Sequence, residues 1–300
     1  MKFPRLMRVR QQFDAPTVEA IPETIRSEMA KLDLGSRVNK GDSVAISVGS
    51  RGIANIALIT KSVIGELRAL GAEPFVVPAM GSHGGGTAEG QRAIIESYGV
   101  TEDFIGAPIR ATMEVERVGE TEDGVPVYFD KFAFAADHVV VVGRVKPHTG
   151  FTGEIESGLH KMMLIGLGKQ KGAALYHQAI VHYSFDRIIR SVGQTVIDQC
   201  GVLLGLGLVE NHYDKTALIK GVGTDEFLER EKELLALAKK WMPRLPFDQV
   251  DLLVIDAMGK NISGSGMDTN VVGRKYNDHA AAEKEFPKVT RILVRGLTPE

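Results

Sequence analysis

The sequence predicts an α/β fold: a parallel-sheet N-terminal domain with an inserted hairpin, followed by a second, smaller α/β domain. Three apolar runs rich in β-branched residues are each followed by a glycine-rich turn and then by a segment of helical periodicity. Strand, glycine turn and helix in repeated order are typical of a parallel sheet covered by helices. The 300 residues, of which 44% are hydrophobic and 25% charged, are enough for one large or two moderate globular domains.

The three repeated units occupy the first half of the chain. Gly71 is a suitable residue to end one predicted helix, and Thr87 is suited to cap the N-terminus of the next. The predicted elements are a strand over 43–48, a turn over 49–52, a helix over 55–70, a strand over 73–78, a turn over 80–86, a helix up to 98 and a strand over 138–142.

The remaining elements follow from the same periodicities. Strand-like runs on both sides of a turn at 120–124 predict a hairpin over 109–129, inserted in the α/β pattern. Further along, we predict a helix over 185–199, paired strands over 202–209 and 216–222, a charged helix over 226–241, a strand over 250–256 and a buried strand over 289–297.

The proline-containing segment 243–247 ends the charged helix and separates the two domains. We assign residues 1–246 to the N-terminal domain and residues 247–300 to the second. A domain of about 50 residues is close to the lower limit for an independent core. We therefore expect the second domain either to be stabilised by packing against the first or to be the incomplete start of a domain in a longer protein.

Composition excludes several classes of partner. The net charge is −2 and the pI is near 6.5, so no overall positive field would attract nucleic acid or an acidic membrane. Cys200 is the only cysteine, which excludes a disulfide framework and a multi-cysteine metal site. The N-terminus lacks the apolar core of a signal peptide, and no apolar run approaches the roughly 18 residues of a membrane span. We expect a cytoplasmic protein.

Three loops at predicted strand ends each hold a polar residue: Arg51, His83 and His148. Ligands of open parallel sheets bind at the carboxyl ends of the strands. Glycine-rich loops before helices expose N–H groups to an anion, and Arg51 would add a two-pronged donor, so a phosphate or carboxylate ligand is indicated. The alternative is that each is an ordinary exposed turn residue, and no nucleotide-binding glycine motif of standard spacing is present.

The segment 145–177 holds three histidines and four lysines. Helical zinc-binding spacing is absent, and His177 and His182 are five residues apart, so a helix would point them to different sides. Lys161 directly precedes an apolar run. It is either a lysine that extends to solvent from the edge of a buried helix or a partly desolvated nucleophile with a lowered pKa. We assign no role to His160, Lys169 and Lys171.

These residues, in this order and spacing, resemble the nickel-pincer lactate racemases and related 2-hydroxyacid racemases and epimerases. The resemblance covers most of the chain from about residue 10. It rests on Arg51, His83 in Gly81-Ser82-His83, His148 in the run from Pro147 to Gly153, Lys161, His177 sixteen residues later (177 − 161), and the segment from Gly266 to Asn270.

The resemblance implies a nickel-pincer nucleotide cofactor, a pyridinium mononucleotide that binds nickel through two sulfurs and a ring carbon. Lys161 would be joined covalently to this cofactor and His177 would be a nickel ligand. The loop residues Gly49, Ser50, Arg51 and Gly153 would contact the cofactor. The partners implied are a 2-hydroxyacid substrate and the enzymes that build the cofactor, with no nucleic acid and no membrane.

The implied reaction is racemisation or epimerisation of a 2-hydroxyacid. The cofactor carbon takes the Cα hydride and returns it to either face of a planar 2-keto acid. His83 and His148 would serve as the two acid/base groups and Arg51 would hold the carboxylate. The sequence around Lys161 and at 273–276 departs from that of the lactate racemases, so the substrate stays open. The alternatives are a nicotinamide- or metal-dependent oxidoreductase of hydroxyacids and a non-catalytic binding protein for a phosphorylated or carboxylated ligand.

Overall fold

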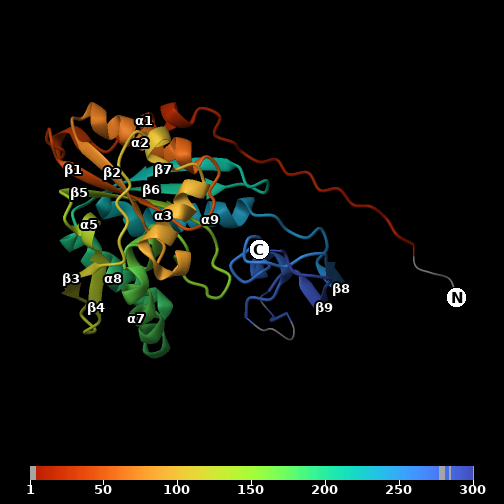
Figure 1. Cartoon of the computed structure of the whole chain (residues 1–300). Coiled ribbons are helices and arrows are strands. Elements are labelled where there is room, and N and C mark those ends of the chain that lie inside the picture. Colours follow the sequence, from red (N-terminus) through yellow and green to blue (C-terminus); the bar gives the residue numbers. More distant parts are fainter. Residues whose placement is uncertain (1–4, 277–280, 284, 300) are drawn as a thin grey trace. The chain divides into compact units, whose positions relative to one another are not determined.

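The computed structural model describes residues 5–276, 281–283 and 285–299, in two compact units. The larger unit is Thr17–Met242, and the smaller one combines the residues before it with those from Pro243 onward (Figure 1). The domain limits proposed above, and the incompleteness of the second domain, stay predictions.

The larger unit is built on a five-stranded sheet with the order β2-β1-β5-β6-β7. Neighbouring strands pair in parallel, except that β6 and β7 are antiparallel. The predicted α/β class with a mostly parallel sheet is therefore confirmed. The strands are β1 (Ser43–Val48), β2 (Glu73–Pro78), β5 (His138–Arg144), β6 (Val202–Glu210) and β7 (Thr216–Val222).

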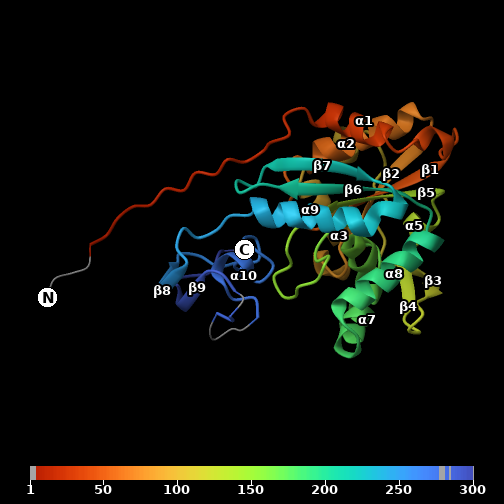
Figure 2. The same cartoon turned by 180° about the vertical axis from the view of Figure 1, so that it is seen from behind.

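Helices cover both faces of this sheet (Figures 1 and 2). Side chains alternate along β1, so Val44 and Ile46 pack in the cluster that contains α1 and α2, and Ala45 packs in the cluster that contains α8. The larger helices are α1 (Ile21–Ala30), α2 (Ile56–Ala69), α3 (Ala88–Ser97), α7 (Lys169–His182), α8 (Phe185–Gln199) and α9 (Phe227–Trp241); the short ones are α4 (Glu102–Ile105), α5 (Lys131–Phe134) and α6 (Leu159–Lys161).

The inserted hairpin is present but shorter than predicted. It pairs β3 (Val115–Glu120) with β4 (Pro126–Asp130) in antiparallel fashion. Ile109, predicted to lie in it, instead forms an isolated parallel bridge with Val76 of β2. The reason is that β2 is an edge strand, so the N–H and C=O groups of Val76 on its outer side have no partner within the sheet. The Val76 N–H donates to the Pro108 oxygen, and the Val76 oxygen accepts the Arg110 N–H.

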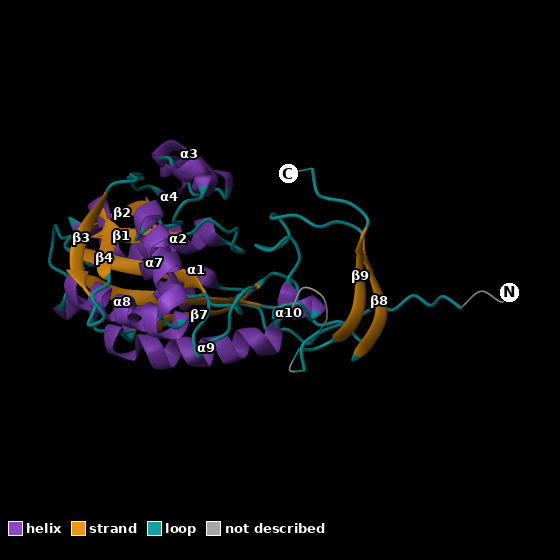
Figure 3. Cartoon of the chain, turned by 90° about the horizontal axis from the view of Figure 1, so that it is seen from below, coloured by secondary structure: helices purple, strands orange, loops and turns teal. Residues whose placement is uncertain are grey.

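The smaller unit contains the parallel pair β8 (Gln249–Ile255) and β9 (Lys288–Val294) and the helix α10 (Thr269–Val272), shown by type in Figure 3. The prediction that 289–297 is a buried strand is wrong: Val289 is buried, but Leu293 is 52% exposed. A two-stranded sheet with one four-residue helix offers too little surface to cover both of its faces. Among the described residues of the whole chain, no helix is long and apolar enough to cross a membrane.

Candidate active site

The loops singled out in the sequence follow β1, β2 and β5, and β1 lies between the other two strands in the sheet. The chain passes from β1 to β2 over one face and from β5 to β6 over the other, so the strand order reverses beside β1. The carboxyl ends of strands at such a switch point are where α/β sheets bind ligands. The fold therefore brings the Arg51, His83 and His148 loops to the carboxyl ends of three neighbouring strands.

The loop after β1 is fixed at two points around Arg51. The Tyr98 hydroxyl donates to the backbone oxygen of Ser50 at 2.8 Å. The backbone N–H of Ala54 donates to the Glu210 carboxylate, also at 2.8 Å. Because other elements hold this loop on both sides of Arg51, at Ser50 and at Ala54, the Arg51 side chain starts from a defined stretch of backbone.

Gly49 allows this loop to approach the segment that holds Lys161. A Cβ at Gly49 would lie 3.3 Å from the terminal methyl carbon of Met162, the residue after Lys161. A side chain here would require the end of the Met162 side chain to shift by a few tenths of an ångström. Packing against Met162 gives a physical reason for this glycine, while its contact with a cofactor stays a prediction.

His83 is joined to the first loop directly. Its Nδ1 is hydrogen-bonded to the Ser50 hydroxyl. The amide of Gln91, a buried residue of α3, donates to the backbone oxygens of Gly81 and His83 at 2.8 and 3.4 Å. The structure thus brings together two of the predicted site residues, His83 and Ser50, and supports the His83 backbone from the protein interior.

His148 is oriented by three contacts. Its ring stacks on Phe151 with 3.5 Å between centroids and 11° between planes, and Phe151 in turn packs on Phe185 at 3.7 Å. The backbone N–H of His148 donates to the buried Glu156 carboxylate at 2.7 Å. The Gly150 N–H donates to Nδ1 at 3.0 Å. Because Nδ1 accepts this bond, the hydrogen-bond network assigns the proton of the neutral ring to Nε2.

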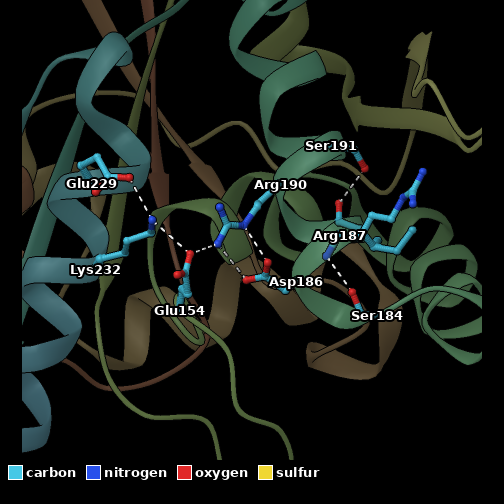
Figure 4. A network of polar contacts seen from close by, with 9 residues as sticks. Glu154, Ser184, Asp186, Arg187, Arg190, Ser191, Glu229 and Lys232 are labelled. Atoms are coloured by element: carbon cyan, nitrogen blue, oxygen red, sulfur yellow. Dashed lines mark hydrogen bonds and ion pairs between the residues drawn. The ribbon is translucent and has the colours of Figure 1, made fainter.

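The loop beyond His148 is tied to two helices through Glu154 (Figure 4). The Glu154 carboxylate pairs with Arg190 of α8 and with Lys232 of α9, the latter at 3.0 Å. Arg190 also pairs with Asp186 at 2.8 Å. Gly153 lies where the loop turns sharply: a Cβ there would come within 2.8 Å of the backbone oxygen two residues later. This turn explains the glycine, and its contact with a cofactor stays a prediction.

Lys161 at the end of α6 lies among other cations. Its ammonium donates to the Ser157 hydroxyl at 3.3 Å and is 5.8 Å from the centre of the Phe151 ring. Burial, with the positive charges of Arg51 and Lys146, lowers the pKa of Lys161 to about 8. A lysine in these surroundings is partly unprotonated near neutral pH and can react as a nucleophile. The second of the two readings left open by the sequence is therefore favoured.

Lys146 is a further cation near Lys161, and the sequence reasoning did not single it out. Its backbone exchanges two hydrogen bonds with Ser157, at 2.9 and 3.2 Å, so the two side chains project to the same side of this antiparallel bridge. The sequence contained a signal for it: Lys146 and His148 are two residues apart directly after a strand, and in an extended segment such residues point to the same side. Arg51, Lys146 and Lys161 together form a positive site suited to an anion.

The segment after Lys161 is not one continuous helix. Residues Met162–Gly166 form a π-helical turn before α7 begins, and such turns occur often at functional sites. His160 and Lys169, to which the sequence assigned no role, are both buried with carboxylate partners. Nδ1 of His160 is hydrogen-bonded to Glu231 of α9 at 2.7 Å, and Lys169 forms an ion pair with Asp130 at 3.0 Å. The exposed Lys171 lies over the Tyr128 ring.

His177 is exposed on α7. Gln170 and Ala173 of this helix lie against the His83 loop: Cβ atoms at Gly86 and Gly81 would approach them to 3.1 and 3.6 Å. Seven residues after Gln170, a helix returns to within about 20° of the same direction. His177 therefore lies on the face of α7 that carries these contacts. Among the described residues, no group of three or more His, Cys, Asp or Glu side chains that could hold a metal ion is present.

The family model for the lactate racemase N-terminal domain matches residues 6–186, more than half of the chain. The chain belongs to the lactate racemase family. The recognition made from Arg51, His83, His148, Lys161 and His177 is thereby confirmed at the level of the family. No curated protein matches the chain.

Two solved structures share the fold of this lactate racemase family member. A protein from Thermotoga maritima is 14% identical, with a TM-score of 0.59 over 84% of this chain and 66% of that one. The lactate racemase apoprotein from Thermoanaerobacterium thermosaccharolyticum is 13% identical, with a TM-score of 0.52 over 81% of this chain and 60% of that one. This chain thus spans less than two thirds of the length of either protein.

The segment from Gly266 to Asn270, another part of the family resemblance, lies in the smaller unit. Asp268 caps α10 by accepting the Asn270 N–H at 3.0 Å, and the Lys275 ammonium donates to the Asn270 side chain at 3.2 Å. Arg274 is buried against the backbone of β9. The side chains of Arg274 and Lys275 are thus both bonded within the smaller unit.

Proposed function

We propose that this protein is a racemase or epimerase of a 2-hydroxyacid that works with a nickel-pincer nucleotide. The observation that carries the proposal is the Lys161 amine, whose pKa is lowered to about 8 in a cluster of cations beside the histidine loops. Membership of the lactate racemase family supports the isomerase class.

The residues of this chain fit such a cofactor. Lys161 offers an amine that can be acylated, Arg51 and Lys146 offer charges for the phosphate or the acid groups, and His177 offers one imidazole for the metal. A cofactor that brings its own sulfur and carbon donors needs no cluster of protein ligands. When bound, the group would supply an electrophilic carbon for reversible hydride transfer with the substrate.

The protein's own part in the reaction is to bind, to orient and to move a proton. Arg51 would hold the substrate carboxylate in a two-pronged contact. One histidine accepts the hydroxyl proton as the carbonyl forms, and the other serves the opposite face. His148 holds its proton at Nε2 and His83 is oriented through its Nδ1 contact with Ser50. Imidazoles that titrate near neutral pH can perform both roles.

A test is the production of the chain together with the cofactor-building enzymes and nickel, followed by incubation with single enantiomers of several 2-hydroxyacids. Chiral chromatography should show the opposite enantiomer for at least one acid. His83→Ala and His148→Ala should each lower the rate by about 10²-fold or more, because each removes an acid/base group. Consumption of a nicotinamide with net production of a keto acid would indicate an oxidoreductase instead. Ligand binding without turnover, little changed in both variants, would indicate a binding protein.

A further inference from the structure

Lys169 occupies a buried position that the reaction does not use. It is the first residue of α7, it is fully buried, and its φ of 55° is rare for a residue with a side chain. Its ammonium donates to the backbone oxygen of Pro78 at the end of β2 and to Gln91 Oε1 at 3.1 Å, and it forms an ion pair with Asp130, 3.0 Å from Oδ2. The ammonium is therefore held by two hydrogen bonds and by the charge of one carboxylate.

Gln91 connects this charge to the His83 loop. Its oxygen faces the ammonium, which can only donate, so its NH₂ group must face the two loop oxygens of Gly81 and His83. The side chain is fully buried. The orientation of the amide is therefore determined by Lys169, and the position of the loop backbone by the amide.

The same lysine starts the helix that carries His177. Gln170 and Ala173, in the first turns of α7, lie close to the glycines on both sides of His83, because a Cβ added at Gly86 or at Gly81 would come within 3.1 or 3.6 Å of them. Asp130 holds the other side of the lysine, and its second oxygen accepts the N–H groups of Phe132 and Ala133 at 2.9 Å. The Lys169–Asp130 ion pair is thus connected both to the His83 loop, through Gln91, and to α7, which carries His177.

An ion pair is a costly way to fill this space. Burial raises the pKa of Asp130 and lowers that of Lys169, which means that the charged form of each group is less stable here than in water. Apolar side chains of similar volume would fill the core at less cost. What apolar side chains would not provide is a set of directed hydrogen bonds to the Gln91 amide and to the end of β2.

We propose that Lys169, Gln91 and Asp130 are positioning residues that fix the His83 loop against α7, and so fix the acid/base His83 relative to the metal ligand His177. The function of the two histidines rests on the proposed function, whereas the mechanical link can be tested in the protein without cofactor.

The test compares amide hydrogen exchange in the cofactor-free chain for Gln91→Leu, Gln91→Glu and the charge-neutral double variant Asp130→Asn/Lys169→Met. Lys171→Met is the matched control, because this exposed lysine lies two residues further along the same helix. Gln91→Glu keeps an acceptor for Lys169 but removes the donor to the loop. Both Gln91 variants should raise exchange over 80–87 by about five- to a hundredfold, the cost of buried acceptors left without donors.

The double variant should raise exchange both in this loop and in the first turn of α7, whose Gly172 N–H bonds to Gly168. Lys171→Met should change neither. Exchange over 80–87 that matches the wild type in Gln91→Leu would overturn the proposal, and the double variant keeps the test valid if Gln91→Leu does not fold.

A second arm measures turnover in the cofactor-loaded protein. Gln91→Leu should lower kcat by about tenfold to a hundredfold with a small change in KM, since misplacement of a catalytic group affects the transition state more than binding. Faster exchange with an unchanged kcat would reduce the three residues to a structural role and overturn the positioning claim. If the wild-type protein itself does not racemise any acid, the proposed function fails, but the exchange arm still decides the mechanical link.

Discussion

The reactivity of Lys161 is the most quantitative expectation. A pKa of about 8 in place of 10.5 means that at pH 7 about a tenth of the amine is unprotonated, roughly 300-fold more than for an ordinary lysine. The direction follows from the causes: burial disfavours the ammonium, and the charges of Arg51 and Lys146 disfavour it further. Acylation of Lys161 should therefore rise with pH, reach half of its maximum near pH 8 and level off above that.

The assay is competitive labelling with a small acylating reagent between pH 6 and 11, read out by peptide mass spectrometry. The exposed Lys171 is the internal reference for reagent decay. Arg51→Gln should move the midpoint for Lys161 upward, because it removes the second-largest cause of the shift. The midpoint should still stay below 10.5, since burial is the largest cause and persists in the variant.

A labelling midpoint for Lys161 close to 10.5 in the folded protein would refute this reasoning. So would a midpoint that does not move in Arg51→Gln, because the cation cluster would then have no electrostatic effect on the amine.

Three further expectations concern stability and accessibility. Glu231→Leu leaves the buried His160 without its acceptor and should lower the free energy of unfolding by about 2–4 kcal/mol in urea denaturation, with Glu229→Leu, on the exposed side of the same helix, as control. Gly201→Ala should cost about 1–2 kcal/mol, because φ there is 60° and the new Cβ would approach the Asp137 oxygen to 2.9 Å; a neutral effect would contradict the local geometry. Burial raises the pKa of Cys200 to about 12, so a thiol reagent at pH 8 should label it only as fast as the protein opens, and rapid labelling of the folded protein would count against this burial.

Much of the architecture could be predicted from local patterns. The strands at 43–48 and 73–78 and the helix at 185–199 coincide with β1, β2 and α8, because an apolar run or a helical period is a property of neighbouring residues. The glycine turns then indicated which loops meet at the carboxyl end of the sheet. The contact between His83 and Ser50 is consistent with that expectation.

What the sequence could not provide are pairings between distant residues. His160 and Glu231 are separated by 71 positions, and Lys169 lies on a helix whereas Asp130 ends a hairpin strand. Without the fold, a buried ion pair and an exposed charged face are indistinguishable in such a segment. The exposure of β9 was missed for the opposite reason: its apolar composition predicts burial, but the described part of its unit supplies too little surface to cover it.

The central claim is that Lys161 carries the cofactor, and intact-mass analysis with peptide mapping tests it most directly. After production with the cofactor-building enzymes and nickel, we expect a covalent mass increase confined to the peptide with Lys161 and about one nickel per chain. Both should be absent in Lys161→Ala, while His177→Ala should keep the adduct and lose nickel. An unmodified Lys161 in protein free of nickel, produced under the same conditions, would contradict the account.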